Sequence, residues 1–409
     1  MKIWIKYLTG IIIGLAFALV IPEENAFFRE LTAYLSELAI NAGRYTLYPV
    51  LFFGFTIAVF ELREHKTLFR TGAAVAGLIS ITTILLAVTA ILAVLVQNPA
   101  RIPIFVEGNL SIESINVRET IRQFVPSNGF EVFTNGLFIL PLCIFAGFAG
   151  AGFTVDKNES KPALTLFDSL SRVSYAVMTF FVDIIAIGMI ALSIHWTVSF
   201  GSLLAGKVFR DFIFLLFFLL FFVALVLYPL LIRLLCDKAN PWRVMYASIA
   251  PVFAAFFSGD SLMTLPVIIR HSNESLGVRR KISSVTLPLF SVFARGGSAM
   301  VIIVSFVVIL KSYSSLGIAF SDMVWLTGTA VLLSFFLGRF PSGGAFIALA
   351  ATCALYGRGF ESGYLILKPA AFFIGSIASA IDALTAITGT YIIAKRREMA
   401  THRELRFFI

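Results

Sequence analysis

Residues 256–300 read FFSGDSLMTLPVIIRHSNESLGVRRKISSVTLPLFSVFARGGSAM, and polar residues interrupt this apolar stretch at two points. The first interruption is SGDS at residues 258–261, and the second is ARGGS at residues 294–298. Charged groups and irregular backbone are tolerated at membrane depth only where protein buries them or where they line a wet cavity. This stretch therefore predicts a pathway for a polar solute through a membrane.

The composition of the whole chain indicates an all-α polytopic membrane protein. Of its 409 residues 59% are hydrophobic and 13% are charged, a balance not expected of a soluble domain. The net charge of +9 falls in short loops, which is typical of membrane orientation and argues against nucleic-acid binding. The three cysteines, Cys143, Cys236 and Cys353, are isolated in or beside apolar segments, so we expect small core residues and no disulfide or metal site.

Apolar runs of about 20 residues, the length that crosses a bilayer, predict eight spans and two re-entrant hairpins. The spans are expected near residues 7–21, 47–60, 72–96, 137–153, 173–194, 212–235, 282–310 and 365–394, and the hairpins near residues 241–271 and 325–364. A signal peptide at residues 1–26 is the alternative to a retained first span. The sixth span has almost no polar residue and is expected to face lipid. Each hairpin precedes an interrupted or polar-striped span, an arrangement that points to a transporter site.

Lysine and arginine set the expected orientation. Most of the 32 basic residues fall on one side of this layout when the N-terminus is placed inside the cell. The positive-inside rule then predicts a protein of the cell inner or plasma membrane with both termini in the cytoplasm.

Several short strings resemble the dicarboxylate/amino acid:cation symporter family, which has the glutamate transporter fold. They are TLPV at 264–267, LPLFSVFARGGSA at 287–299, FPSGGA at 340–345, ITGTYIIAK at 387–395, and the Thr82-Thr83 pair of the third span. The resemblance covers nearly the whole chain and implies a homotrimer with an elevator mechanism. Residues 1–70 and 134–206 would be scaffold, residues 71–97 and 207–395 the transport domain, and residues 396–409 a cytoplasmic tail.

The chain departs from the family pattern where the family binds solute and sodium. In the seventh span Arg295 replaces a methionine and Gly296 replaces an aspartate. In the last span Ala378 stands where the family has its solute-binding arginine, and Ala386 stands where it has a sodium-binding aspartate. Asp382 replaces an asparagine. We therefore expect transport with altered or reduced sodium coupling.

The candidate site combines these positions. Solute contacts are expected from Ser261, Arg295, Ser298, Phe340, Gly344, Ser379 and Asp382, cation coupling from Thr82, Thr83 and Asp382, and hairpin tips at Ser258, Gly259, Asp260, Pro341, Ser342 and Gly343. Each position also has a purely structural interpretation. Arg295 could be satisfied by freed backbone carbonyls, Asp260 could cap a helix, and the threonines could bond back to their own helix.

No catalytic constellation or cofactor motif is present in the sequence, so an enzyme is not expected. The leading hypothesis is a secondary transporter of a small carboxylate-bearing solute, such as an amino acid or dicarboxylate, with Na⁺ or H⁺ as the coupling ion. An anion-conducting channel and a non-transporting solute sensor on the same fold remain as alternatives. A structural role is expected for Asp183 in the fifth span.

Overall fold

The computed structural model describes residues 2–20, 26–97, 99–103, 115, 117–134, 136–237, 239–313 and 319–409. Within these ranges the chain is helical, and its only extended pairings are two isolated bridges, Asp260 with Ser342 and Val278 with Ala400. The prediction of an all-α protein is therefore confirmed.

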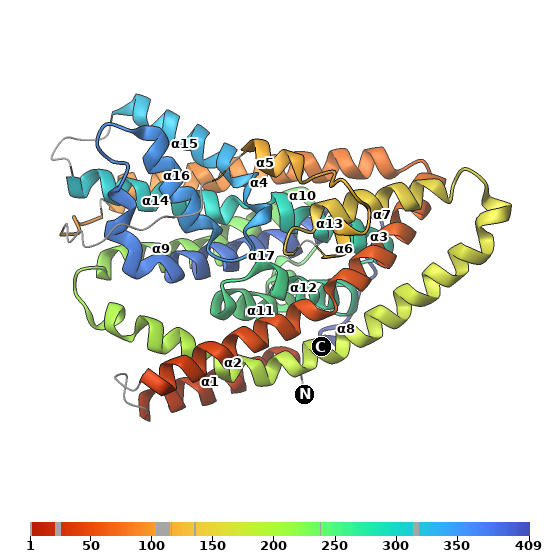
Figure 1. Ribbon diagram of the computed structural model, residues 1–409, viewed down its shortest axis with the longest axis horizontal. Coiled ribbons are helices and arrows are strands. Elements are labelled where there is room, and N and C mark those ends of the chain that lie inside the picture. Colours follow the sequence, from red (N-terminus) through yellow and green to blue (C-terminus); the bar gives the residue numbers. More distant parts are fainter. Residues whose placement is uncertain are drawn as a thin grey trace.

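One set of helices, here called the outer group, lies along one side of the molecule (Figure 1). It comprises α1 (Ile3–Val20), α2 (Ala26–Tyr45), α3 (Leu47–Glu64), α7 (Leu140–Gly152) and α8 (Lys157–Ala205). Helix α1 crosses α8 at Gly10 and Gly14, where an added Cβ would come within 2.5 Å of the carbonyl oxygens of Ala186 and Ile190. Small residues four apart permit this close packing of membrane helices.

The remaining helices form the inner group, which packs around α17 (Ala371–Arg396). It includes the long helix α4 (Leu68–Gln97) and the two consecutive helices α13 (Arg280–Phe293) and α14 (Gly296–Tyr313). It also includes one continuous helical run made of α9 (Arg210–Phe222), the π-helical turn η1 (Val223–Leu227) and α10 (Tyr228–Leu235). Two helix pairs complete it: the first pair is α11 (Pro241–Ser258) with α12 (Ser261–Glu274), and the second is α15 (Phe320–Ser334) with α16 (Gly344–Tyr356). In Figure 1 the first pair lies between α2 and α17.

Short helices connect these elements. They are α5 (Val117–Arg122), α6 (Glu131–Thr134), η2 (Leu337–Arg339), η3 (Gly363–Ala370) and η4 (Leu405–Phe407). Helices α5 and α6 lie in the segment between α4 and α7, part of which lies outside the described residues.

Seven helical runs within the described residues are long and apolar enough to cross a membrane. They are Ile3–Val20, Phe27–Glu64, Leu68–Gln97, Lys157–Gly201, Arg210–Leu235, Arg280–Tyr313 and Gly363–Arg396. The expected fourth span corresponds to α7, whose 13 residues rise only about 20 Å. Residues 26–45, which lie between the first two expected spans, are helical and lead into α3.

The expectation that the sixth span faces lipid is wrong for half of its surface. Phe212, Leu216 and Leu219 are buried, whereas Phe214 and Phe221 are exposed. The helix has an apolar surface on all sides, so its sequence gives no sign of which side packs against protein.

The two ends of the chain meet. The Nζ of Lys2 donates hydrogen bonds to the carbonyl of Leu405 at 3.1 Å and to the hydroxyl of Tyr246 in α11 at 3.0 Å. The C-terminal segment also pairs with the turn after α12, where Thr401 N donates to Gly277 O at 2.9 Å. The tail thus covers the end of the first helix pair.

Candidate functional site

The turn of the first helix pair is held by its own side chains. Gly259 adopts a left-handed conformation, with φ of 60°, which ends α11. Asp260 then begins α12 as its N-cap, because its carboxylate accepts a hydrogen bond from Met263 N at 2.7 Å. Ser258 donates to Ala254 O at 2.6 Å. The structural interpretation of Asp260 as a cap is therefore confirmed.

Asp260 also forms an ion pair with Arg44 at the end of α2. Arg44 Nε lies 3.3 Å from Asp260 Oδ1, and Arg44 Nη2 contacts Asp260 Oδ2 more closely. The aspartate side chain is fully buried and that of Arg44 is 18% exposed. Arg44 was not predicted as a site residue, because it lies 216 positions from Asp260 in the sequence, at the end of a polar segment.

The turn of the second helix pair contacts that of the first directly. Gly343, with φ of 69°, precedes α16, and the preceding residues 337–339 form one short helical turn. Ser261 N and Ser261 Oγ both donate to Pro341 O, at 3.0 Å and 3.3 Å. Asp260 pairs with Ser342 in an isolated bridge. The two expected tips therefore lie against each other.

The break between α13 and α14 places Arg295 beside these turns. Its Nη2 donates to Ser261 Oγ at 2.6 Å, and its Nη1 lies 3.7 Å from Asp382 Oδ2. The side chain is 4% exposed, and its Nε has no hydrogen-bond partner within the described residues. Arg295 is thus held by side chains on two other elements, Ser261 and Asp382, and is only partly satisfied.

The carboxylate of Asp382 in α17 caps the N-terminus of α14. It accepts hydrogen bonds from Gly297 N at 2.7 Å, Ser298 N at 3.4 Å and Ser298 Oγ at 2.9 Å. Gly297 must lack a side chain here, because an added Cβ would lie 2.8 Å from Asp382 Oδ1. A carboxylate suits this position, since the N-terminus of a helix favours negative charge. With Arg295 it forms a charge-balanced buried pair.

The two threonines of α4 differ from each other. Thr82 Oγ1 donates back to Leu78 O at 2.8 Å and to Ile79 O at 3.1 Å, as the structural interpretation expected. Thr83 Oγ1 is buried without a partner within the described residues, next to Gly296. Of these two hydroxyls, only that of Thr83 has no hydrogen-bond partner within the described residues.

A small cavity lies where the second turn, the α13–α14 break and α17 meet. It is nearly closed, with about 10 Å³ of free space, and it is lined by Arg295, Ser298, Leu337, Phe340, Pro341, Gly343, Gly344, Ala345, Gly375, Ala378 and Ser379. Five of the seven expected solute contacts are in this lining, and the other two, Ser261 and Asp382, contact Arg295. The cavity offers a guanidinium, hydroxyls and closely approachable backbone, which are groups suited to an anionic solute.

Asp183 lies outside this cavity. Its carboxylate pairs with Lys6 Nζ at 2.7 Å and with Arg270 Nη1 at 3.1 Å, which joins α1 and α8 to α12. Where the structure describes the chain, no group of three histidine, cysteine or acidic residues could hold a metal ion.

Comparison with known proteins identifies the family. The "Sodium:dicarboxylate symporter family" matches residues 3–396. A serine/threonine transporter, SstT, from Streptococcus agalactiae serotype III (strain NEM316) is 22% identical over 363 residues, 86% of this chain and 85% of the relative. The C4-dicarboxylate transport protein of Bacillus subtilis (strain 168) is 22% identical over 48% of each chain. The neutral amino acid transporter B(0) of Oryctolagus cuniculus is 26% identical over 51% of this chain and 38% of its own length.

This match explains the seven apolar helical runs and the absence of catalytic motifs from the sequence, because the family consists of membrane transporters rather than enzymes. The resemblance noted in the short strings extends over nearly the full length. The chain belongs to the sodium:dicarboxylate symporter family.

Proposed function

We propose that this protein is a secondary active transporter of a small carboxylate-bearing solute, which Arg295 anchors. The observation that carries this proposal is the Nε of Arg295, a buried donor without a partner beside a cavity. A buried donor left unpaired is costly, so a solute oxygen that pairs with it would stabilise the bound state. Arginine suits this role, because its planar fork recognises carboxylates in bidentate fashion.

The hydrogen bonding around Arg295 leaves donors for that pairing once the cavity opens. Asp382 already accepts three hydrogen bonds from the start of α14, and its 3.7 Å distance from Arg295 Nη1 is too long for a direct hydrogen bond. The pair therefore supplies charge balance while the guanidinium keeps donors free. The relatives' names fit this chemistry, since serine, threonine, neutral amino acids and C4-dicarboxylates all carry a carboxylate.

The proposal extends to the mechanism. The outer group would supply the scaffold of a homotrimer, and the inner group would carry the solute across as a mobile unit, with both helix pairs re-entrant. Ion pairs between the groups, such as Arg44 with Asp260, would then break and re-form. Contact between the two chain ends supports placing both termini on one side of the membrane, the cytoplasmic one.

We further propose that this transporter depends less on sodium than its family name implies. A hard cation prefers several oxygen ligands, and carboxylates raise its affinity. Gly296 and Ala386 supply none at the positions where the family has acids, and Thr82 is committed to its own helix. The Arg295 guanidinium would repel a cation placed beside it. Proton coupling through Asp382 or solute exchange would take the place of sodium.

Uptake into proteoliposomes tests the function. Amino acids and dicarboxylates are screened by counterflow, first with sodium, potassium or choline outside and then with a pH gradient. Saturable counterflow that persists without sodium is expected, with a response to the pH gradient that Asp382→Asn abolishes if protons couple. Strict sodium dependence unaltered in Asp382→Asn would refute the reduced coupling. Current without saturable flux would indicate a channel instead, and binding without flux would indicate a sensor.

A further inference from the structure

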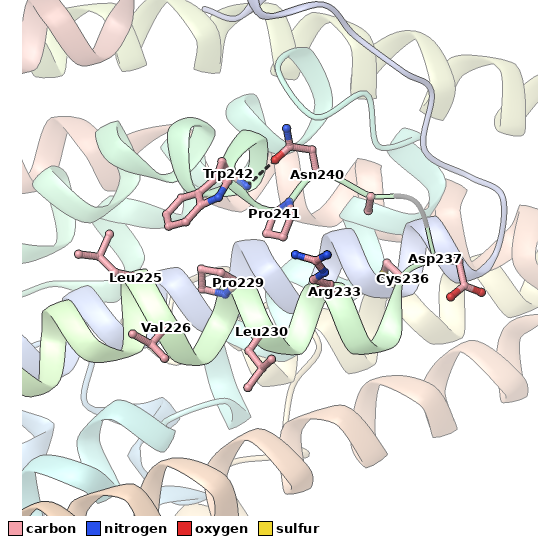
Figure 2. A pocket seen from close by; sticks show the side chains of 11 residues that line it. Leu225, Val226, Pro229, Leu230, Arg233, Cys236, Asp237, Asn240, Pro241 and Trp242 are labelled. Atoms are coloured by element: carbon pink, nitrogen blue, oxygen red, sulfur yellow. Dashed lines mark hydrogen bonds between the residues drawn. The ribbon is translucent and has the colours of Figure 1, made fainter.

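An open groove lies between α10 and the start of α11, well away from the solute cavity (Figure 2). It is lined by Leu225, Val226, Pro229, Leu230, Arg233, Cys236, Asp237, Ala239, Asn240, Pro241 and Trp242. It holds about 790 Å³, which falls within the roughly 300–1,000 Å³ of small-molecule sites. The groove is therefore large enough for a ligand, and the chemistry of its lining decides which kind of ligand fits.

The two ends of the groove differ in chemistry. Figure 2 shows Leu225 and Trp242 towards one end, and Arg233 and Asp237 towards the other. Leu225, Val226 and Leu230 are each about half exposed, so their apolar surface has no cover within the described chain. An amphiphile, with an apolar tail and a polar head, matches this arrangement.

Three residues of the groove wall lie in one row along a helix. Leu225, Pro229 and Arg233 recur every four residues and so lie in one row, which rises about 12 Å from the first to the last. The row begins within the π-helical turn η1, where Tyr228 N donates to Val223 O five residues earlier. Pro229 follows and has no N–H for the carbonyl of Leu225. Such turns interrupt a helix at some cost and are frequent at functional sites.

The polar end carries net positive charge. Arg233 lines this end of the groove, and Arg396 reaches the same end of α10, where its Nε donates to Leu235 O at 3.0 Å. Asp237 is the one carboxylate in the groove lining. Helix α11 also begins here, capped by Asn240 Oδ1, which accepts from Trp242 N at 3.0 Å, and its N-terminus favours an anion.

We propose that this groove binds a membrane phospholipid with an anionic headgroup. The acyl chain lies along Leu225, Val226 and Leu230, and the phosphate lies beside Arg233. Trp242, 56% exposed, lies towards the apolar end with Leu225 and adds aromatic surface for the acyl chain. Arginine keeps its charged end in a polar setting while its stem packs on apolar surface. The protein's membrane setting supplies the ligand, and the proposal does not depend on which solute is transported.

Native mass spectrometry of the full chain, released from detergent, tests this site. Phosphatidylglycerol is compared with phosphatidylcholine of identical acyl chains. At least threefold greater retention of phosphatidylglycerol is expected. Arg233→Gln should reduce that retention to the phosphatidylcholine level, and Leu230→Trp, which fills the apolar part, should reduce retention of both lipids. Arg70→Gln is the matched control, because Arg70 is an exposed arginine outside the groove.

Two further experiments distinguish a bound lipid from a free anion. Inorganic phosphate at millimolar concentration should not displace the lipid, because it lacks the acyl chain, and displacement would indicate a simple anion site. Phosphatidylglycerol with a photoreactive acyl chain should label peptides within residues 225–242. Equal retention of the two lipids, unchanged retention in Arg233→Gln, or labelling only elsewhere would overturn the proposal. Occupancy of the groove by a second copy of the chain, seen as a crosslink between copies at these residues, would do so as well.

Discussion

The two helix-pair turns meet, yet they are held in different ways. The first turn is fixed by side chains: Asp260 is fully buried, caps α12 and pairs with Arg44 of the outer group. In the second turn Ser342 and Gly343 are exposed, and its recorded bonds to the first turn run from Ser261 to one backbone carbonyl, that of Pro341. The difference indicates that the first turn is anchored to the protein around it, whereas the second can separate from it at low cost.

This difference assigns the two turns different parts in the proposed mechanism. Opening the second turn would break two hydrogen bonds from Ser261 and expose the cavity beside Arg295. Opening the first would also separate Asp260 from Arg44, a side-chain contact that the second turn lacks. We therefore propose the second turn as the gate.

The largest effect is expected at the anchored turn. Asp260→Ala removes the cap and leaves Arg44, which is 18% exposed, without its partner, so stability should fall by at most about 3–5 kcal/mol. Asp260→Asn keeps a capping oxygen and should lose less. Thermal unfolding in detergent measures both changes. If Asp260→Ala unfolds at the temperature of the parent protein, the first turn is not anchored by this pair.

The next effect is expected at the second turn, on binding rather than on stability. A Cβ at residue 344 would lie 3.2 Å from Phe340 Cβ, so the two methyl groups of valine must displace the turn. Gly344→Val should weaken solute binding about 100-fold, roughly 2.7 kcal/mol, and leave the assembly intact. Gly328→Val is the control, because no atom lies within 4 Å of its Cβ position. Unchanged affinity in folded Gly344→Val would remove this turn from the site.

The smallest effect is expected away from both turns, at Asp183. Its side chain is 37% exposed, so its ion pairs with Lys6 and Arg270 are partly screened by solvent. Asp183→Asn should change stability by less than about 1 kcal/mol. A loss as large as that of Asp260→Ala, in the same unfolding assay, would show that the first pair is anchored along its length rather than at its turn.

The sequence singled out residues that the structure brings together, although it missed some of their surroundings. Ser379 and Asp382 of α17 were expected near Arg295, and in the structure Ser379 lines the cavity beside Arg295 while Asp382 pairs with it. Such residues stand out as polar groups within one apolar segment. The Arg44–Asp260 pair was not predictable, because it depends on how two segments 216 residues apart pack. The buried face of α9 was missed because apolar residues surround that helix on all sides.

The central claim is that Arg295 anchors a carboxylate, and counterflow in proteoliposomes with the parent protein and Arg295→Met tests it most directly. L-serine and succinate serve as carboxylate probes, each against its amide. The account predicts saturable uptake of at least one carboxylate, none of its amide, and no uptake by folded Arg295→Met, while Ser379→Ala only weakens transport. Uptake by Arg295→Met with the KM and rate of the parent protein would contradict it.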